Sequence, residues 1–543
     1  MFILFILYDH GEMVKYLRIL YQIITKNAYL IIWCSVGIFS LVTLYVRSKV
    51  IFLVNPDIGG VESNVIYSVL RMLAGFPLYQ NPEQAPYAIT QYSPIYYYLT
   101  VGVSRLVGLT ADDVYDVYAV GRCISLVANV FYVWGIVWLA RRLQLTTSVA
   151  ILVGLLAFIL LPPQSYGRPD SLYNALVIWT LWAVLGWISS DSAKSLVYGA
   201  ALTACLAALA LFSKQSGLCL PIIIGGYLIF VSPISRQIFP FLGWYALFIG
   251  LLYYSLFWQD ATLIYANVIQ GVSNGIDLAN FKHNLVDHYL RPFAWLVIPS
   301  LAISIRYSIF EQGARQFIGL SVLGLFLFAM ATGLKWGSAL NYFTEFTGLS
   351  FLLIADTIRL FRSKLSDWAN VGRLALLLAV IWVVPVNAMN FNWERSFNKP
   401  VDMTQYQQEQ AVAQYVKNEL TKHNNGLVYS TLYNSSYLNA FLFRHCIVPQ
   451  QDLMIGSAYP LRSFDYTDLD RAAQDGRVQF VISRNGETDA PLSPPVYLGN
   501  YRPIKSIGDY TIYKFNPSAG QLSDLSSEDK AKSTQRIISP SLE

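Results

Sequence analysis

The stretch AYLIIWCSVGIFSLVTLYVRSKVIFLVNPDIGGVE, residues 28–62, joins a long apolar run to a polar turn with two carboxylates, Asp57 and Glu62. The apolar part, residues 28–46, is close to the ~20 residues that a helix needs to cross a membrane. The rest of the 543-residue chain has the same character, since 55% of its residues are hydrophobic and only 13% are charged. Soluble proteins carry about 25% charged residues. The composition therefore excludes a cytosolic enzyme and predicts an integral membrane protein.

Similar apolar blocks recur along the chain, and each predicts a membrane-spanning helix. There are about eleven, at residues 28–46, 118–140, 149–161, 172–188, 196–212, 218–231, 239–258, 292–305, 317–333, 342–361 and 374–389. Lys and Arg concentrate in the cytoplasmic loops of membrane proteins. With residues 1–27 inside, every inner loop carries at least one such residue, although Arg47 and Lys49 go against the rule. We therefore expect the long first loop, 55–117, and everything after residue 390 to lie outside.

The first external loop contains two further helix-forming segments. Residues 94–108 are apolar, but they are short and are interrupted by Arg105. Counting them as a span would invert every later loop and place the basic pair at 141–142 outside. We therefore predict a re-entrant or interfacial helix here, and a second helix lying on the membrane at 62–75.

The composition changes after about residue 397. Residues 403–423 predict a polar amphipathic helix, and runs rich in β-branched and aromatic residues follow at 427–430, 478–483 and 510–515. We expect a small external α/β domain over residues 397–517. Residues 518–543 are rich in Ser, Asp and Lys and lack aromatic residues, which predicts a disordered tail.

Charge and cysteine usage narrow the range of partners. The net charge is +5, and the basic residues stand mostly singly between apolar blocks. This pattern indicates topology signals, so we expect no nucleic-acid partner. Four of the five cysteines lie within apolar blocks and Cys446 stands alone, which leaves no disulfide framework or CxxC metal site.

Asp57 and Glu62 stand five residues apart at the membrane surface, directly before a predicted helix. A carboxylate that is partly desolvated there has a raised pKa and is suited to proton abstraction. The alternative is that both residues only cap and solvate the start of the helix. The pair alone leaves both interpretations open.

The neighbouring motifs favour the first interpretation. The sequence continues with Gly75-Phe76-Pro77-Leu78-Tyr79, Tyr92-Ser93-Pro94-Ile95-Tyr96, Gly121-Arg122, Arg141-Arg142-Leu143, Arg168-Pro169-Asp170, Lys335-Trp336-Gly337-Ser338 and Asn341-Tyr342. In this order, the motifs resemble those of the GT-C superfamily of polytopic glycosyltransferases, of the protein mannosyltransferase and aminoarabinose transferase type. The resemblance covers roughly residues 28–390.

The resemblance implies a GT-C fold and a role for each motif. Asp57 occupies the position of the catalytic base, which deprotonates the acceptor hydroxyl so that it attacks and inverts the anomeric carbon of a polyprenyl-phosphate sugar. Glu62 is the candidate second acidic residue, binding sugar or acceptor, although its five-residue offset departs from the adjacent pair of many relatives.

A leaving lipid phosphate needs cations beside it. The candidates are Arg168 with Asp170 to orient it, Lys214, Lys335 and Arg291. For Arg168 the alternative is a helix-end Arg–Asp pair, for the lysines a snorkelling side chain, and for Arg291 an interface anchor. Further candidates for binding donor or acceptor are Tyr79, Tyr92, Tyr96, Asn341 and the intramembrane Glu345. For the tyrosines of the first loop the alternative is membrane-interface anchoring, and for Glu345 it is a carboxylate facing water.

A metal site is not predicted. His283 and His288 are five residues apart, which places their rings on different faces of an α-helix, unlike the spacing of four in a zinc helix. No motif requires a cofactor. A divalent cation bridged by Asp57 to the lipid phosphate is an open alternative.

Together these features predict an inverting glycosyltransferase that moves one sugar from a polyprenyl-phosphate carrier to a lipid, glycan or protein acceptor. We expect it in a bacterial inner membrane, with its active site on the external side. The alternatives are a lipid flippase or secondary transporter, whose duplicated halves are not evident here, an oligosaccharide ligase or polymerase, and a non-catalytic protein of the same fold. The sugar and the acceptor are not identified by the sequence.

Overall fold

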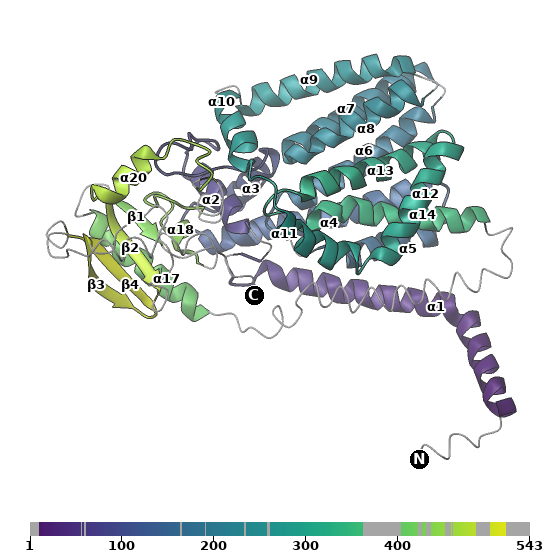
Figure 1. The fold of residues 1–543 in the computed structure, drawn as a ribbon, viewed down its shortest axis with the longest axis horizontal. Helices are drawn as coiled ribbons and strands as arrows, with labels where there is room; N and C mark the ends of the chain where they lie inside the picture. The colour runs from purple at the N-terminus through teal and green to yellow at the C-terminus, as the bar shows by residue number, and fades with distance from the viewer. Residues whose placement is uncertain are drawn as a thin grey trace.

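The computed structural model describes residues 10–55, 57–58, 61–162, 166–190, 192–232, 235–257, 261–361, 403–421, 426–430, 436–450, 458, 460–484 and 500–516. A bundle of long helices makes up most of the molecule, and a small α/β domain packs against one end of it (Figure 1). The bundle helices are α1 (His10–Ile51), α4 (Val114–Arg142), α5 (Thr147–Ile159), α6 (Asp170–Ile188), α7 (Ala193–Ser213), α8 (Cys219–Phe230), α9 (Ile238–Phe257), α12 (Ala294–Phe310), α13 (Ala314–Gly333) and α14 (Thr344–Phe361).

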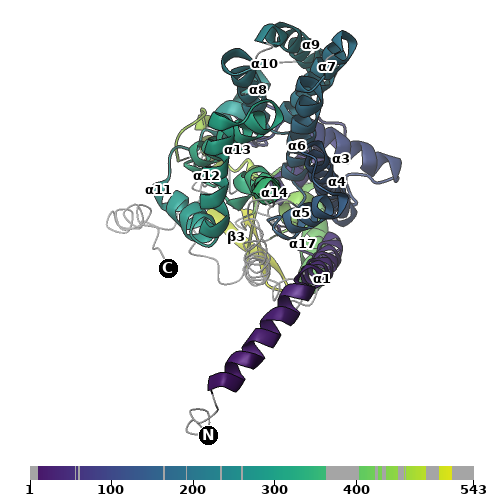
Figure 2. The same ribbon diagram turned by 90° about the vertical axis from the view of Figure 1, so that its right-hand side faces the viewer.

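Short helical pieces connect these helices. They are η2 (Gln215–Leu218), η3 (Ser235–Gln237), α10 (Ala261–Ile264), η4 (Tyr265–Ile269), η5 (Gln270–Val272), α11 (Leu278–Asn280), η6 (Phe281–Leu290) and η7 (Leu340–Phe343). Figure 2 shows the bundle from the end opposite the α/β domain, with α14 at the centre of the bundle. This helix contacts α4, α5, α6, α12 and α13.

Within the described ranges, six helices are long and apolar enough to cross a membrane, namely Leu30–Ile51, Val114–Arg142, Asp170–Ile188, Leu196–Ser213, Ile238–Leu256 and Ala314–Gly333. A seventh candidate is the pair Leu278–Leu290 and Ala294–Phe310, which bends by 86°. The predicted blocks at 149–161 and 218–231 are helical but shorter. The polytopic helical fold is therefore confirmed, whereas the number of eleven spans stays a prediction because the block at 374–389 lies outside the described residues.

The first loop forms the two predicted helices, α2 (Glu62–Leu73) and α3 (Ile95–Leu106). We expected α2 to lie on the membrane, but ten of its twelve residues are buried. It packs against α3, α4 and α18 (Leu438–Phe441) of the C-terminal domain. The amphipathic pattern of this helix thus reflects packing under the C-terminal domain.

The C-terminal domain contains α17 (Met403–Thr421), α18, α20 (Thr467–Gln474) and the strands β1 (Leu427–Ser430), β2 (Val478–Arg484), β3 (Tyr501–Ile507) and β4 (Tyr510–Phe515). The sheet order is β1-β2-β4-β3. β1 and β2 are parallel, and the other pairs are antiparallel, with Val481 opposite Tyr513. This confirms a small α/β unit. Its expected boundaries, 397–517, stay a prediction, and the expected tail at 518–543 lies outside the described residues.

This domain is anchored to the first loop by hydrogen bonds. The hydroxyl of Tyr87 donates to Asp468 over 2.7 Å, and the backbone N–H of Tyr87 donates to the carbonyl of Ile447 over 2.9 Å. Gln450 accepts from the N–H of Ile89 at 2.7 Å. The domain therefore covers the first loop and the polar residues near it.

Candidate functional site

The first polar group follows α1 and is called the acidic loop, residues Asn55, Asp57, Ile58 and Glu62. Asp57 Oδ1 accepts from the backbone N–H of Glu62 at 3.2 Å, and Asn55 Oδ1 accepts from the N–H of Asp57 at 3.0 Å. Val61 has φ of 57°, a left-handed conformation that is rare for a β-branched residue. This backbone strain is typical of loops whose surroundings fix their conformation.

Arg122, on α4, holds the acidic loop in place through several hydrogen bonds. Its Nε lies 2.7 Å from Glu62 Oε1 and its Nη2 lies 3.0 Å from Glu62 Oε2. The same guanidinium donates to the carbonyls of Leu53 at 2.6 Å and Asn55 at 2.5 Å. Both side chains of the ion pair are fully buried. The sequence motif Gly121-Arg122 pointed to this residue, but sequence reasoning gave it no role in the site.

A second polar group is called the basic cluster, and Asp170, at the start of α6, is at its centre. The ammonium of Lys214 lies 2.7 Å from Asp170 Oδ1, Arg168 Nε lies 3.1 Å from Oδ2, and Asn341 donates to Oδ1 over 2.6 Å. Lys214 also lies over the ring of Tyr342, 4.7 Å from its centroid. Four predicted residues, Arg168, Asp170, Lys214 and Asn341, thus come together from three separate parts of the sequence.

Burial alone would lower the pKa of Arg168 and of Lys214, but the adjacent Asp170 carboxylate raises both above their usual range. Lys335 behaves differently. Burial and the nearby charge of Lys214 lower its pKa to about 8. Within the described residues, no carboxylate pairs with the Lys335 ammonium. Arg168 and Lys214 therefore flank one tightly bound carboxylate, and Lys335 lies near enough to Lys214 to be affected by its charge but, among the described residues, has no paired carboxylate.

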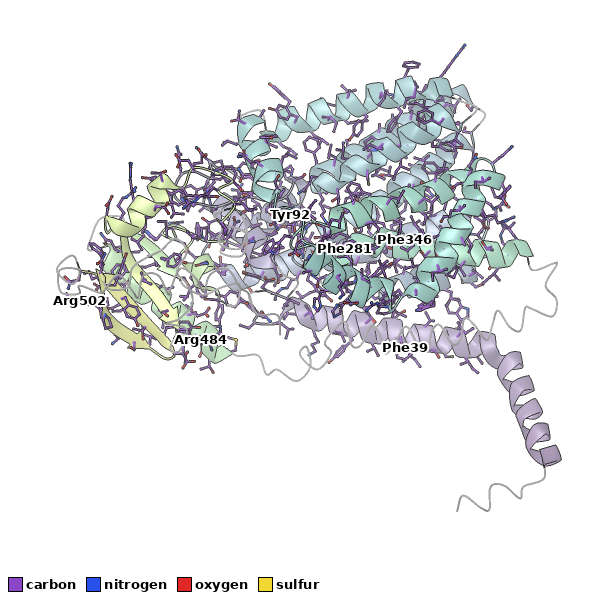
Figure 3. The ribbon with its side chains drawn as sticks, in the orientation of Figure 1. Phe39, Tyr92, Phe281, Phe346, Arg484 and Arg502 are labelled. Atoms are coloured by element: carbon purple, nitrogen blue, oxygen red, sulfur yellow. The ribbon has the colours of Figure 1, made fainter. Side chains whose placement is uncertain are left out.

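Two further predicted residues border the basic cluster. Glu345 is 4% exposed at the first turn of α14, and it hydrogen-bonds to Tyr173. The hydroxyl of Tyr92 accepts from Arg168 Nη2 at 2.9 Å, and burial raises its pKa to about 12. Figure 3 shows Tyr92 where the helical bundle meets the C-terminal domain.

Tyr79 and Tyr96 hydrogen-bond to backbone carbonyls. The hydroxyl of Tyr79 donates to the backbone carbonyl of Tyr92 over 2.9 Å. The hydroxyl of Tyr96 donates to the carbonyl of Gly121 over 2.7 Å. Both are buried, so they support the site from within the protein, and their predicted contact with substrate stays a prediction.

The acidic loop and the basic cluster meet at Gly167. This glycine has φ of 57°, and its backbone packs so closely on the Glu62 carboxylate that a Cβ at this position would overlap it. The next residue, Arg168, accepts a hydrogen bond at its carbonyl from Ser125, which lies on the same helix as Arg122. A carboxylate-bearing loop therefore borders a site rich in positive charge.

Arg291 and the two histidines lie outside this arrangement. Arg291 is 69% exposed and pairs with Asp287 at 2.5 Å. His283 and His288 have ring centroids 4.5 Å apart. The prediction that their rings lie on different faces is wrong, because the segment is a π-helix, in which residues five apart come into line. In the described part of the chain, no three His, Cys, Asp or Glu side chains form a metal-binding group.

No family model and no curated protein matches this chain. Among solved structures, ArnT from Cupriavidus metallidurans in the apo state is similar at a TM-score of 0.60 and 13% identity, over 89% of this chain and 98% of that chain. The same protein bound to undecaprenyl phosphate is similar at a TM-score of 0.55 and 12% identity, over the same shares, 89% and 98%.

An archaeal oligosaccharyltransferase, AglB from Archaeoglobus fulgidus in complex with an inhibitory peptide and a dolichol-phosphate, is also similar. Its TM-score is 0.55 at 12% identity, over 83% of this chain and 69% of that chain. Similarity at this level of identity concerns the fold. The comparisons thus show that this chain shares its fold with ArnT and with the archaeal oligosaccharyltransferase AglB.

Proposed function

We propose that this protein is an inverting glycosyltransferase that moves a single sugar from a polyprenyl-phosphate carrier to an acceptor at the external face of the membrane. The observation that carries the proposal is the basic cluster, where Arg168, Lys214 and Lys335 gather at helix ends beside apolar helices. Positive charge there stabilises the phosphate that forms when the sugar leaves. The structures of ArnT with undecaprenyl phosphate and of AglB with dolichol-phosphate support a lipid phosphate as the ligand.

In the proposed reaction, Asp57 accepts the proton of the acceptor hydroxyl. The acceptor oxygen then forms a bond to the anomeric carbon from the face opposite the phosphate. The bond between the anomeric carbon and the phosphate oxygen breaks, and the lipid phosphate leaves with the electron pair. The configuration at the anomeric carbon inverts, and the new negative charge on the phosphate lies among the cations of the basic cluster.

Each remaining residue has a role in this scheme. Arg168 can grip phosphate oxygens with its planar guanidinium, while Asp170 and Asn341 hold Lys214 in place. Lys335 supplies a cation that no carboxylate of the described residues neutralises. Glu62 and Arg122 act as positioning residues, because they clamp both sides of the loop that carries Asp57. We assign the active site to the external side of the membrane, as the charge pattern of the loops predicts. We assign the protein to a bacterial inner membrane because a single short external domain on such a helical core resembles that of bacterial relatives.

The test is transfer activity of the full chain in nanodiscs with a panel of polyprenyl-phosphate sugars. We expect product from the wild type and a loss of about 10²-fold or more in Asp57→Asn, since a general base contributes on this order. The matched control is Asp116→Asn, an exposed carboxylate in the first turn of α4, which should retain full activity. Equal turnover by wild type and Asp57→Asn would refute the assignment of the base. Transport of lipid without sugar transfer would instead support the flippase alternative.

A further inference from the structure

A cavity of about 240 Å³ lies at the junction of the C-terminal domain and the first loop, apart from the site described above. Its lining includes Lys417 from α17, Arg444 and His445 from the turn after α18, Asp112 from the loop before α4, and the rings of Phe441 and Phe443. A water molecule occupies about 30 Å³ of liquid. The cavity therefore has room for one sugar-sized molecule.

Positive charge dominates this cavity. Lys417 lies 3.9 Å from Asp112, and this pair is open to solvent, with 38% and 73% of the side chains exposed. Arg444 stacks over Phe443, 5.4 Å from the ring centroid, and within the described residues no carboxylate pairs with it. Burial lowers the pKa of His445, and Lys417 and Arg444 lower it further. An anion bound between Lys417 and Arg444 would relieve this repulsion and receive charge-assisted hydrogen bonds.

The cavity lies near the two helices that carry Arg122 and Glu62, α4 and α2. Asp112 is two residues before the start of α4, and Arg122 is eight residues into that helix, about 12 Å along its axis. On the other wall, Tyr67 of α2 donates to the carbonyl of Phe443 over 3.5 Å, and α2 begins at Glu62. A molecule bound in the cavity would thus lie within reach of the acidic loop through an extended chain of sugar units.

We propose that this cavity binds an anionic sugar unit of the acceptor, with its carboxylate or phosphate between Lys417 and Arg444 and its ring against Phe441 and Phe443. That the bound sugar belongs to the acceptor rests on the proposed function. The binding itself does not depend on catalysis. Charged units of one acceptor would be held before the start of α4, whose first turn lies about 12 Å along the helix axis from Arg122. Such a contact would select acidic glycans or glycolipids over neutral ones.

The experiment measures binding by titration calorimetry with the full chain in phosphatidylcholine nanodiscs, without a donor. The probes are glucuronate, glucose 6-phosphate and, as the neutral reference, glucose. We expect at least one acidic sugar to bind ten-fold or more tightly than glucose. The double variant Lys417→Gln with Arg444→Gln should lose this binding by ten-fold or more, and Arg502→Gln, on the edge strand β3 (Figure 3), should keep it. Glucuronate binding alone indicates a carboxylate ligand, and glucose 6-phosphate binding alone indicates a phosphate ligand.

A separate variant distinguishes the cavity from the basic cluster. Lys214→Gln should leave acidic-sugar binding unchanged if the cavity is the site. Loss of binding in Lys214→Gln, unchanged binding in the double variant, or equal affinity for glucose would overturn the proposal. Because no sugar is transferred in this experiment, absence of transfer activity in the wild type would refute the proposed function without changing these binding results.

Discussion

The ammonium of Lys214 and the side-chain amide of Asn341 both contact Asp170 Oδ1, at 2.7 and 2.6 Å. Through this single oxygen, the end of α7 and the segment before α14 are tied to the start of α6. The two side chains come from positions 127 residues apart. The contact shows that direct interactions between side chains hold the basic cluster together. The cluster is not a set of separate charges at helix ends.

Replacing Asp170 should therefore destabilise the protein. Asp170→Asn leaves Lys214 and Arg168 buried without their counter-charge, and loss of one partner of a buried ion pair costs about 3–5 kcal/mol. We expect a clear decrease of the Tm, measured by thermal unfolding in detergent. The matched control is Asp287→Asn, because its pair with Arg291 is exposed and surface pairs contribute about 0–1 kcal/mol. Equal melting temperatures for the two variants would contradict the central role of Asp170.

Lys335 should give a pH-dependent affinity for lipid phosphate. Its pKa of about 8 means that it is cationic below pH 8 and neutral above. The phosphate is already fully ionised there, since its second pKa is about 6. The affinity for undecaprenyl phosphate should then fall as the pH rises through about 8, as fluorescence titration with a labelled lipid would detect. Lys335→Arg should abolish this fall because an Arg side chain keeps its charge.

The same lysine should lower the stability of the ligand-free protein. Its pKa is about 8 in the folded state against about 10.4 in an unfolded chain, so the unfolded state binds the proton more tightly. The resulting cost is fully present below pH 8 and disappears as the pH rises above the unfolded pKa. Lys335→Gln should thus raise the Tm at pH 7 while it weakens lipid phosphate binding. A lower Tm in this variant would show that the ammonium has a stabilising partner.

Arg122 should affect turnover more than donor binding. Arg122→Lys keeps a positive charge but cannot reach Glu62 and the carbonyls of Leu53 and Asn55 together. The loop with Asp57 would lose its fixed geometry, and a displacement of about 1 Å can cost 10²-fold. We expect a lower kcat, by about 10–100-fold, with the KM for the donor unchanged. A purely structural role would instead lower the amount of folded protein and leave kcat per folded molecule intact.

Gly167 should not tolerate a side chain. In Gly167→Ala the new Cβ would overlap the Glu62 carboxylate, and a left-handed conformation costs an L-residue about 1–2 kcal/mol. Transfer activity and Tm should both decrease. Gly226→Ala in α8 is the control, since its Cβ would meet no atom within 4 Å and alanine favours a helix. Full activity in Gly167→Ala would show that the acidic loop and the turn at Arg168 are not coupled.

The prediction at the two histidines shows where local sequence rules end. In an α-helix, a spacing of five residues places the rings of His283 and His288 on different faces. The segment Phe281–Leu290 is instead a π-helix, in which the two rings lie together. The same limit applies to α2, whose amphipathic pattern indicated a membrane surface although the C-terminal domain covers it. In both cases the local sequence predicts a helix correctly. It does not predict the type of helix at the histidines or the domain that packs on α2.

The helical membrane fold follows from the sequence alone. Apolar runs of the length of Val114–Arg142 can form all their backbone hydrogen bonds in lipid only as helices. It also supplied most of the basic cluster, since charges are costly within apolar blocks and mark sites of function. Which of these charged side chains contact each other depends on the packing of the helices. Asp170, Lys214 and Asn341 converge because the packing of α6, α7 and α14 sets the distances between helix ends. Arg122 acquired its role in the same way, since its four hydrogen bonds depend on how α4 lies beneath the acidic loop.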